Sequence, residues 1–190
     1  PGHYSLGTVI ANGVVTNLAD QQIECPAGQF NAAHRQASCI DASPGYYVAL
    51  TGQTVQSECP AGTYSSSSGS VSCTDSDAGY YVPNAGSVGQ YPCPAGTYQD
   101  QQGQSSCKEA DPGFIVSGTT SVVQTECPAG TYQPTSGQVN CIQAEPGHYV
   151  ANAGSTSQTL CDVGTYQSQF GQTSCVDADK GHYVSSAGST

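Results

Sequence analysis

Ten cysteines fall at strictly repeated intervals, and this spacing constrains the chain more than any other feature of its sequence. They form five pairs whose members are 14 positions apart, and successive pairs begin 34 positions apart. The segment from Cys93 to Cys107, CPAGTYQDQQGQSSC, represents all five copies. A fixed period of this length is typical of tandem-repeat proteins, in which each supersecondary unit packs on the next.

The composition leaves little material for a hydrophobic core. Val, Leu, Ile and Phe together number 28 of the 190 residues, and Trp and Met are absent. A fraction below about 20% is typical of disordered chains, but covalent links can replace a missing core. Zinc fits badly because structural zinc sites need short C-x2–4-C spacings, whereas the gaps here alternate between 14 and 20. We therefore expect structural disulfides and an oxidising compartment.

Charge and motif content narrow the function further. The net charge is −11, with Arg35, Lys108 and Lys180 as the only fixed cations, so nucleic acid is not an expected partner. No apolar run is long enough to span a membrane. No nucleophile elbow, phosphate-binding loop or C-x-x-C pair is present, so we expect neither an enzyme nor a cofactor. A first residue other than Met favours a processed product or a piece of a longer protein.

The period divides the chain into six segments. These are an atypical first repeat at 1–43, full repeats at 44–77, 78–111, 112–145 and 146–179, and a partial sixth repeat at 180–190. The first repeat carries an insertion of about nine residues in an apolar stretch, where Asn12-Gly13 between two apolar pairs predicts a hairpin. This segment either caps the stack or docks a neighbouring molecule.

A period of 17 residues lies inside the period of 34. Glycine recurs every 17 positions from Gly28 to Gly181, and a second glycine follows seven positions later except where Arg35 and Thr120 stand. An aromatic residue lies two positions after the first glycine, with Ile115 as the one departure. These aromatics are Phe30, Tyr47, Tyr64, Tyr81, Tyr98, Tyr132, Tyr149, Tyr166 and Tyr183.

Each 17-residue half predicts a short hairpin. Gly-x-Tyr with Thr or Val beside it is strand-like, and the second glycine suits a turn that needs a positive φ. The returning strand brings the second cysteine of a pair back to the first, and closing a loop of about 15 residues is worth about 3 kcal/mol. Stacked hairpins can place tyrosine rings over the glycines of the next unit. We expect an all-β chain of small disulfide-stapled hairpin repeats stacked into an elongated rod, with little or no helix.

The pattern CPAGTY…G…SC followed by PGYYV resembles the cysteine-rich repeats of the ephrin-receptor-like and growth-factor-receptor-like group, over nearly the whole chain. The resemblance implies an extracellular or cell-surface location. One departure is that those families usually place a further cysteine shortly after the second, where this chain has sequences such as Asp75-Ser76-Asp77. The implied disulfides are Cys25–Cys39, Cys59–Cys73, Cys93–Cys107, Cys127–Cys141 and Cys161–Cys175.

Two further sites are candidates on residue type alone. Carboxylates at alternate positions can hold calcium, although turn chemistry is the preferred interpretation because no further carboxylates follow. Exposed hydroxyls at Thr63, Thr97 or Thr131 are candidates for O-linked glycans, because the chain has no N-x-S/T sequon. The candidate calcium ligands are Asp75, Asp77, Glu109, Asp111, Asp177 and Asp179.

The sequence favours a structural function. We expect a subunit or segment of an extracellular filament, appendage or surface stalk, with copies joined head to tail because the chain begins and ends in the same phase of the repeat. The alternative is a binding ectodomain, in which a receptor or adhesin stalk presents a ligand-binding head. A calcium-stabilised matrix protein is a third hypothesis.

Overall fold

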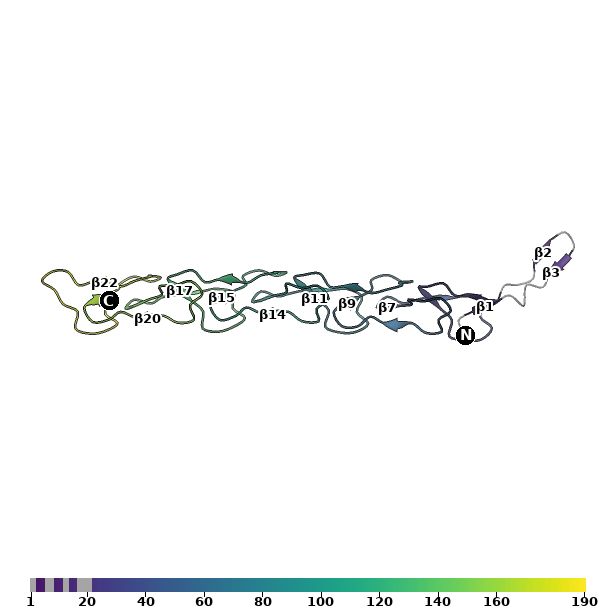
Figure 1. Cartoon of the computed structure of the whole chain (residues 1–190), viewed down its shortest axis with the longest axis horizontal. Coiled ribbons are helices and arrows are strands. Elements are labelled where there is room, and N and C mark those ends of the chain that lie inside the picture. The colour runs from purple at the N-terminus through teal and green to yellow at the C-terminus, as the bar shows by residue number, and fades with distance from the viewer. Residues whose placement is uncertain (1–2, 6–8, 12–13, 17–21) are drawn as a thin grey trace. The chain divides into compact units, whose positions relative to one another are not determined.

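The computed structural model describes residues 3–5, 9–11, 14–16 and 22–190, and its only regular elements are short β-strands (Figure 1). No helix occurs within these ranges. The contacts divide the chain into two compact units, 1–91 with 102–106 and 92–101 with 107–190. The expected all-β architecture of disulfide-closed hairpins is confirmed.

Twenty-two strands make eleven two-stranded antiparallel sheets among the described residues. β1 pairs with β4 and β2 with β3, and from β5 onward each odd-numbered strand pairs with the next. The first four strands are β1 (His3–Ser5), β2 (Val9–Ala11), β3 (Val14–Thr16) and β4 (Gln22–Glu24).

The remaining strands have two residues each. They are β5 (Gln29–Phe30), β6 (Ile40–Asp41), β7 (Tyr46–Tyr47), β8 (Ser57–Glu58), β9 (Thr63–Tyr64), β10 (Thr74–Asp75), β11 (Tyr80–Tyr81), β12 (Tyr91–Pro92), β13 (Thr97–Tyr98), β14 (Lys108–Glu109), β15 (Phe114–Ile115), β16 (Thr125–Glu126), β17 (Thr131–Tyr132), β18 (Ile142–Gln143), β19 (His148–Tyr149), β20 (Thr159–Leu160), β21 (Thr165–Tyr166) and β22 (Val176–Asp177).

In eight of the hairpins from β5 onward, the column residue, which is aromatic except at Ile115, faces the first residue of the returning strand. Phe30 faces Ile40 and Tyr132 faces Ile142 in register. Cross-strand pairs of an aromatic with a β-branched side chain stabilise a sheet. Two-stranded ribbons are nevertheless marginal alone in water, so stability must come from contacts between hairpins.

Backbone hydrogen bonds join each hairpin to the next one and to the one after it in both units. In the first unit, Gly45 N–H donates to Ser65 O at 2.8 Å and Gly69 N–H donates to Ala42 O at 2.8 Å. In the second unit, Gly113 N–H donates to Gln133 O at 2.8 Å and Gly137 N–H to Ala110 O at 2.8 Å. Because the bonds use main-chain atoms, the stack tolerates wide variation in the exposed side chains.

The first glycine column allows a closer contact, between hairpins two apart. A Cβ on Gly62 would lie 2.2 Å from the carbonyl oxygen of Gly103, and one on Gly130 would lie 2.2 Å from that of Gly171. Both glycines also have φ near +90°. Only glycine fits there, since any side chain would meet the backbone of another turn.

The core is a string of small buried residues with alternating chemistry. Buried residues at intervals of 17 alternate between the first cysteine of a pair and Ala or Ser, as in Cys25, Ala42, Cys59 and Ser76. A second buried column, also with an interval of 17, alternates Val with polar residues, as in Gln133, Val150 and Gln167. Buried polar groups find partners, as where Gln133 Nε2 donates to Asn140 O at 2.8 Å. This narrow core explains how the chain folds with so few large apolar residues.

The insertion predicted in the first repeat corresponds to a second hairpin. His3 pairs with Glu24, 21 positions away, whereas the equivalent pair Tyr46 and Glu58 lies 12 positions apart, a difference of nine. The extra residues include β2 and β3, whose register pairs Ala11 with Val14. The predicted turn at Asn12-Gly13 lies outside the described residues.

The second glycine column provides a stability prediction. Arg35 and Thr120, which replace glycine in this column, are the only non-glycine residues with positive φ in the part of the chain that the structure describes, at 63° and 58°. L-residues are strained there by about 1 kcal/mol or more, and a β-branched side chain is especially unfavourable. We expect Thr120→Gly to raise the free energy of unfolding by about 1 kcal/mol in a urea titration.

The control for this prediction is Thr120→Ala, which removes the hydroxyl but keeps the strained L-configuration. It should raise stability by less than Thr120→Gly does, because an L-residue remains at positive φ, while Thr120 is exposed and its backbone N–H, which donates to Cys93 O at 2.9 Å, is retained in both variants. Equal effects of the two substitutions would show that backbone strain is not the cause.

Candidate functional site

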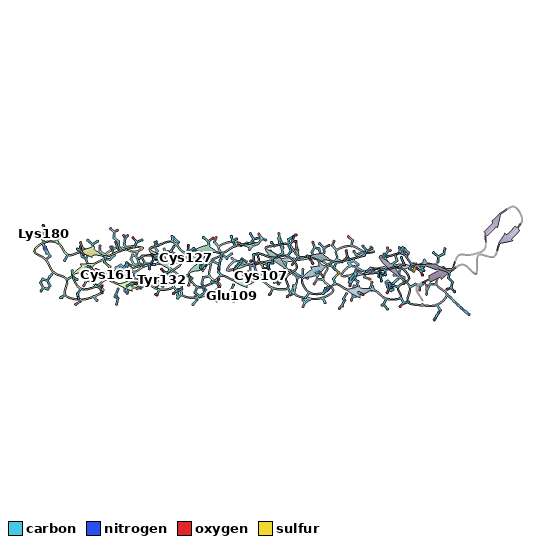
Figure 2. The ribbon with its side chains drawn as sticks, in the orientation of Figure 1. Cys107, Glu109, Cys127, Tyr132, Cys161 and Lys180 are labelled. Carbon is cyan, nitrogen blue, oxygen red and sulfur yellow. A yellow bond between two sulfur atoms is a disulfide. The ribbon has the colours of Figure 1, made fainter. Side chains whose placement is uncertain are left out.

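Five disulfides close alternate hairpins, and each joins cysteines 14 positions apart. Cys107, Cys127 and Cys161 mark three of them in Figure 2. The first cysteine of every pair is fully buried, and the second is partly exposed. No cysteine is free within the described residues. Each disulfide stabilises the folded chain by about 3 kcal/mol for a loop of this size. The five disulfides therefore supply much of the stability of the chain.

The alternate hairpins, which have no disulfide, contain a glutamine at the place of the second cysteine. Gln56, Gln90, Gln124 and Gln158 lie 11 positions after a column glycine, as Cys39 does after Gly28. We name the hairpins β7–β8, β11–β12, β15–β16 and β19–β20 glutamine hairpins, and those closed by a cystine disulfide hairpins.

Each of these glutamines ties the two ends of its hairpin together. Gln124 Oε1 accepts the Asp111 N–H at 2.7 Å, and Gln124 Nε2 donates to Asp111 Oδ2 at 2.7 Å. Gln90 makes the same two bonds to Asp77, at 2.7 Å each. We call this paired contact the glutamine clamp. It contributes about 1 kcal/mol per bond, less than a disulfide.

The residue that follows the first cysteine, and its counterpart in the glutamine hairpins, explain why clamp and disulfide alternate. The residue after the first cysteine is proline in four of the five disulfide hairpins, for example Pro128, and proline has no N–H to donate. In the glutamine hairpins this position is Ser43, Asp77, Asp111 or Glu145, whose N–H needs an acceptor. The sequence interpretation missed the clamp, although aligning the two 17-residue halves places Gln over Cys.

The aromatic column is half-buried along the hairpins from Phe30 to Tyr166, and Tyr183 is exposed. The one ring pair found among the described residues joins Tyr81 with Tyr91, at 6.0 Å between centroids, within a single hairpin. The atoms nearest to a Cβ on the first-column glycines belong to another backbone turn, not to an aromatic ring. Stacking between units by these aromatics stays a prediction.

Four of the six candidate calcium ligands have protein neighbours in the structure. Asp77 and Asp111 are held by the glutamine clamp, and Glu109 Oε2 accepts a bond from Ser136 Oγ at 2.7 Å. Asp75 lies against the turn at Gly103, at 3.4 Å from the position of a Cβ there. No three His, Cys, Asp or Glu side chains converge on a metal-sized site within the described part of the chain. Turn chemistry for these carboxylates and calcium binding by them, including at Asp177 and Asp179, both stay predictions.

The threonines considered for O-glycans cap local turns. Thr63, Thr97 and Thr131 each donate their hydroxyl to the proline carbonyl three positions earlier, at 2.7–2.8 Å. All three side chains are half-buried. A glycan at these hydroxyls would have to give up that bond, and glycosylation there stays a prediction.

Two exposed interactions shift side-chain pKa values. The hydrogen bond from Lys108 Nζ to Asp100 lowers the pKa of Asp100 and raises that of Lys108. The Glu58 carboxylate, which accepts a bond from the Tyr46 hydroxyl at 3.0 Å, raises the pKa of Tyr46. Exposed pairs of this kind contribute little to stability.

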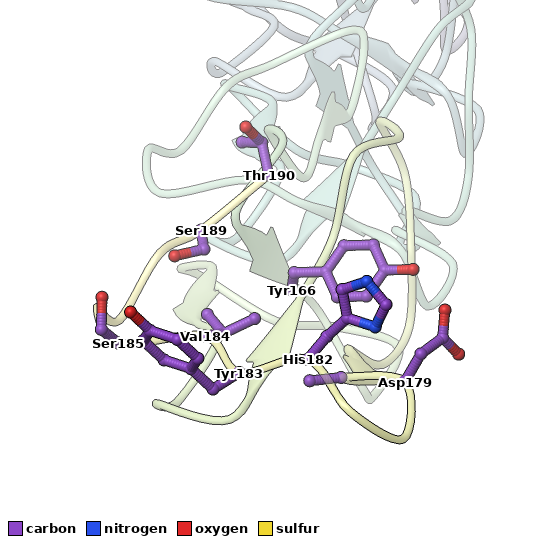
Figure 3. Close-up of a pocket in the computed structure, with 9 residues that line it drawn as sticks. Tyr166, Asp179, His182, Tyr183, Val184, Ser185, Ser189 and Thr190 are labelled. Atoms are coloured by element: carbon purple, nitrogen blue, oxygen red, sulfur yellow. The ribbon is translucent and has the colours of Figure 1, made fainter.

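A pocket of about 440 Å³ lies among the last hairpins, lined by Tyr166, Asp179, His182 and Val184 among others (Figure 3). Nothing lies within 4 Å of a Cβ placed on Gly164 or Gly181, whereas the equivalent Gly147 meets the Gly188 carbonyl at 2.3 Å.

Residues 113–161 match the family model described as tyrosine-protein kinase ephrin type A/B receptor-like. The regular disulfides fit the cysteine-rich repeats of this group, which are not typically enzymatic, and together they indicate an extracellular or secreted location. No curated protein matches the chain. Among the described residues, no helix has the length and apolar character needed to cross a bilayer. The chain is therefore similar to the ephrin-receptor-like cysteine-rich repeats of extracellular ectodomains.

Proposed function

We propose that the chain is a structural spacer, a segment of an extracellular filament, appendage or surface stalk. The observation that carries this proposal is the repeated backbone bonding, in which Gly62 N–H donates to Val82 O in one unit and Gly130 N–H donates to Val150 O in the other, both at 2.8 Å. Because each hairpin bonds to the next through the same contacts, the stack can be extended by adding repeats, as is typical of repeat proteins that act as spacers.

Head-to-tail joining of copies is the finer part of the proposal. The bonds between successive hairpins use main-chain atoms, as where Gly130 N–H donates to Val150 O at 2.8 Å, so a second copy can add by the same kind of contact. Contacts that repeat in one direction without closing produce open filaments. Joining should appear as particle mass that grows with protein concentration in sedimentation experiments and as linear particles in negative-stain micrographs.

The spacer proposal predicts how the size of the molecule depends on the number of repeats. Deleting residues 112–145, one full period, joins Asp111 to Pro146 and so restores an Asp-Pro junction. For stacked strands about 4.8 Å apart, four strands per repeat should shorten the maximum dimension by about 20 Å. Small-angle X-ray scattering on the two chains measures this change.

Mass spectrometry after alkylation should first show that the remaining four disulfides are intact in the shortened chain. A maximum dimension that changes by only a few ångström, as for a compact particle, would contradict the spacer role. The second candidate, a binding ectodomain, is favoured by the match of residues 113–161 to a receptor-like family. It predicts a monomer at every concentration tested.

A further inference from the structure

The two kinds of hairpin differ in how their ends are fastened, whereas the backbone bond that closes each of them is the same. The bond that closes a disulfide hairpin, such as Ala144 N–H to Gly130 O, measures 2.9 Å. The bond that closes a glutamine hairpin, such as Cys127 N–H to Gly113 O, also measures 2.9 Å. The closing backbone bond therefore has the same length in both kinds of hairpin, and the fastening beside it is a difference that can change how readily each one opens.

We propose that the glutamine hairpins are reversible opening points, which unfold locally and reclose while the disulfide hairpins beside them stay shut. This inference deepens the proposed spacer function, on which it rests, because it makes the stack extensible in alternate segments. An opened glutamine hairpin can release its whole 17-residue half, whereas a cystine still limits the separation of the two ends of its loop.

The physical reason is the difference in the open state. A disulfide restricts the opened loop and so lowers the entropy gained on opening. The clamp at Gln124 exchanges its two bonds for bonds with water when the hairpin opens, so it opposes opening only weakly. Local openings of this kind are the least stable motions of a folded protein and appear in amide hydrogen exchange.

The four clamps are graded in strength. Gln90 and Gln124 each hold an aspartate through two bonds of 2.7 Å. Gln158 holds Glu145 with bonds of 2.8 and 3.2 Å. Gln56 accepts the Ser43 N–H at 2.7 Å, and serine offers no carboxylate for its amide. The hairpin closed by Gln56 should therefore open most readily.

Native-state amide exchange followed by NMR tests the proposal on the intact oxidised chain. Protection factors at Cys59, Cys127 and Cys161, which close glutamine hairpins, should be about tenfold or more below those at Ala42, Ala110 and Ala144, which close disulfide hairpins. Protection should be lowest at Cys59. Equal protection in the two sets would overturn the proposal, whatever the shape of the particle.

Two variants change how the ends of the β15–β16 hairpin are fastened. Ala110→Cys with Gln124→Cys puts cysteines at the positions that correspond to Cys93 and Cys107, and Ala110 is buried where Cys93 is buried. Formation of that disulfide should raise the protection of Cys127 about tenfold and leave Cys161, in an unaltered glutamine hairpin, unchanged. Gln124→Ala should lower protection at Cys127 alone.

Unchanged protection at Cys127 in both variants would overturn the proposal. If the new disulfide does not form, the wild-type comparison and Gln124→Ala still decide it. Failure of the spacer function is distinguishable, because it would appear in the scattering dimensions while the exchange pattern held.

Discussion

Gly130→Ala is expected to lower the free energy of unfolding by about 3 kcal/mol or more, measured in urea under non-reducing conditions. The new Cβ would lie 2.2 Å from the Gly171 carbonyl oxygen and 2.9 Å from its carbonyl carbon. Because both groups belong to the backbone of a hairpin turn, neither can move aside as a flexible side chain would. The substitution also forces an L-residue to adopt φ of 86°.

Gly164→Ala separates these two causes. Gly164 has the same φ of 86°, but nothing lies within 4 Å of the position of its Cβ. Gly164→Ala should therefore lower the free energy of unfolding only through the backbone strain, by about 1–2 kcal/mol. If the two variants were equally destabilised, the close approach of hairpins two apart would contribute nothing to stability.

Local rules predicted the hairpins well because their signals lie within a single half-repeat. Positive φ in both glycine columns follows from turn chemistry, and even the exceptions Arg35 and Thr120 adopt it. The pairing of cysteines 14 apart is equally local, because the returning strand brings them together. The family match at residues 113–161 confirms the resemblance that the same motif suggested.

What the sequence interpretation missed depends on contacts between hairpins or between chemically different groups. The contact of Gly62 with Gly103 spans 41 positions, more than one repeat, and no periodicity of single columns reveals it. The carboxylate of Asp111 was considered as a calcium ligand because its residue type suggested one. Its partner is the amide of Gln124, which only alignment of the two halves would have placed opposite.

Removing the disulfide Cys127–Cys141 by double substitution to alanine is expected to lower the free energy of unfolding by about 3 kcal/mol. Alanine should pack well in place of the buried Cys127, since Ala110 and Ala144 occupy the equivalent buried positions in neighbouring hairpins. The loss therefore reports loop closure more than a cavity. Gln124→Ala is the matched control, with an expected loss of about 1–2 kcal/mol for the clamp.

Reduction of all five disulfides is expected to unfold the chain without denaturant. Five closures at about 3 kcal/mol each total roughly 15 kcal/mol, the upper end of the stability of ordinary domains, and the narrow core of small residues cannot replace them. Circular dichroism and NMR on the reduced, alkylated chain measure the loss. Should that chain keep dispersed amide resonances, hydrogen bonds between hairpins rather than covalent closure would be the main source of order. The glutamine clamp would then be comparable to the disulfide in strength, because both would contribute small increments to a stack held by its backbone.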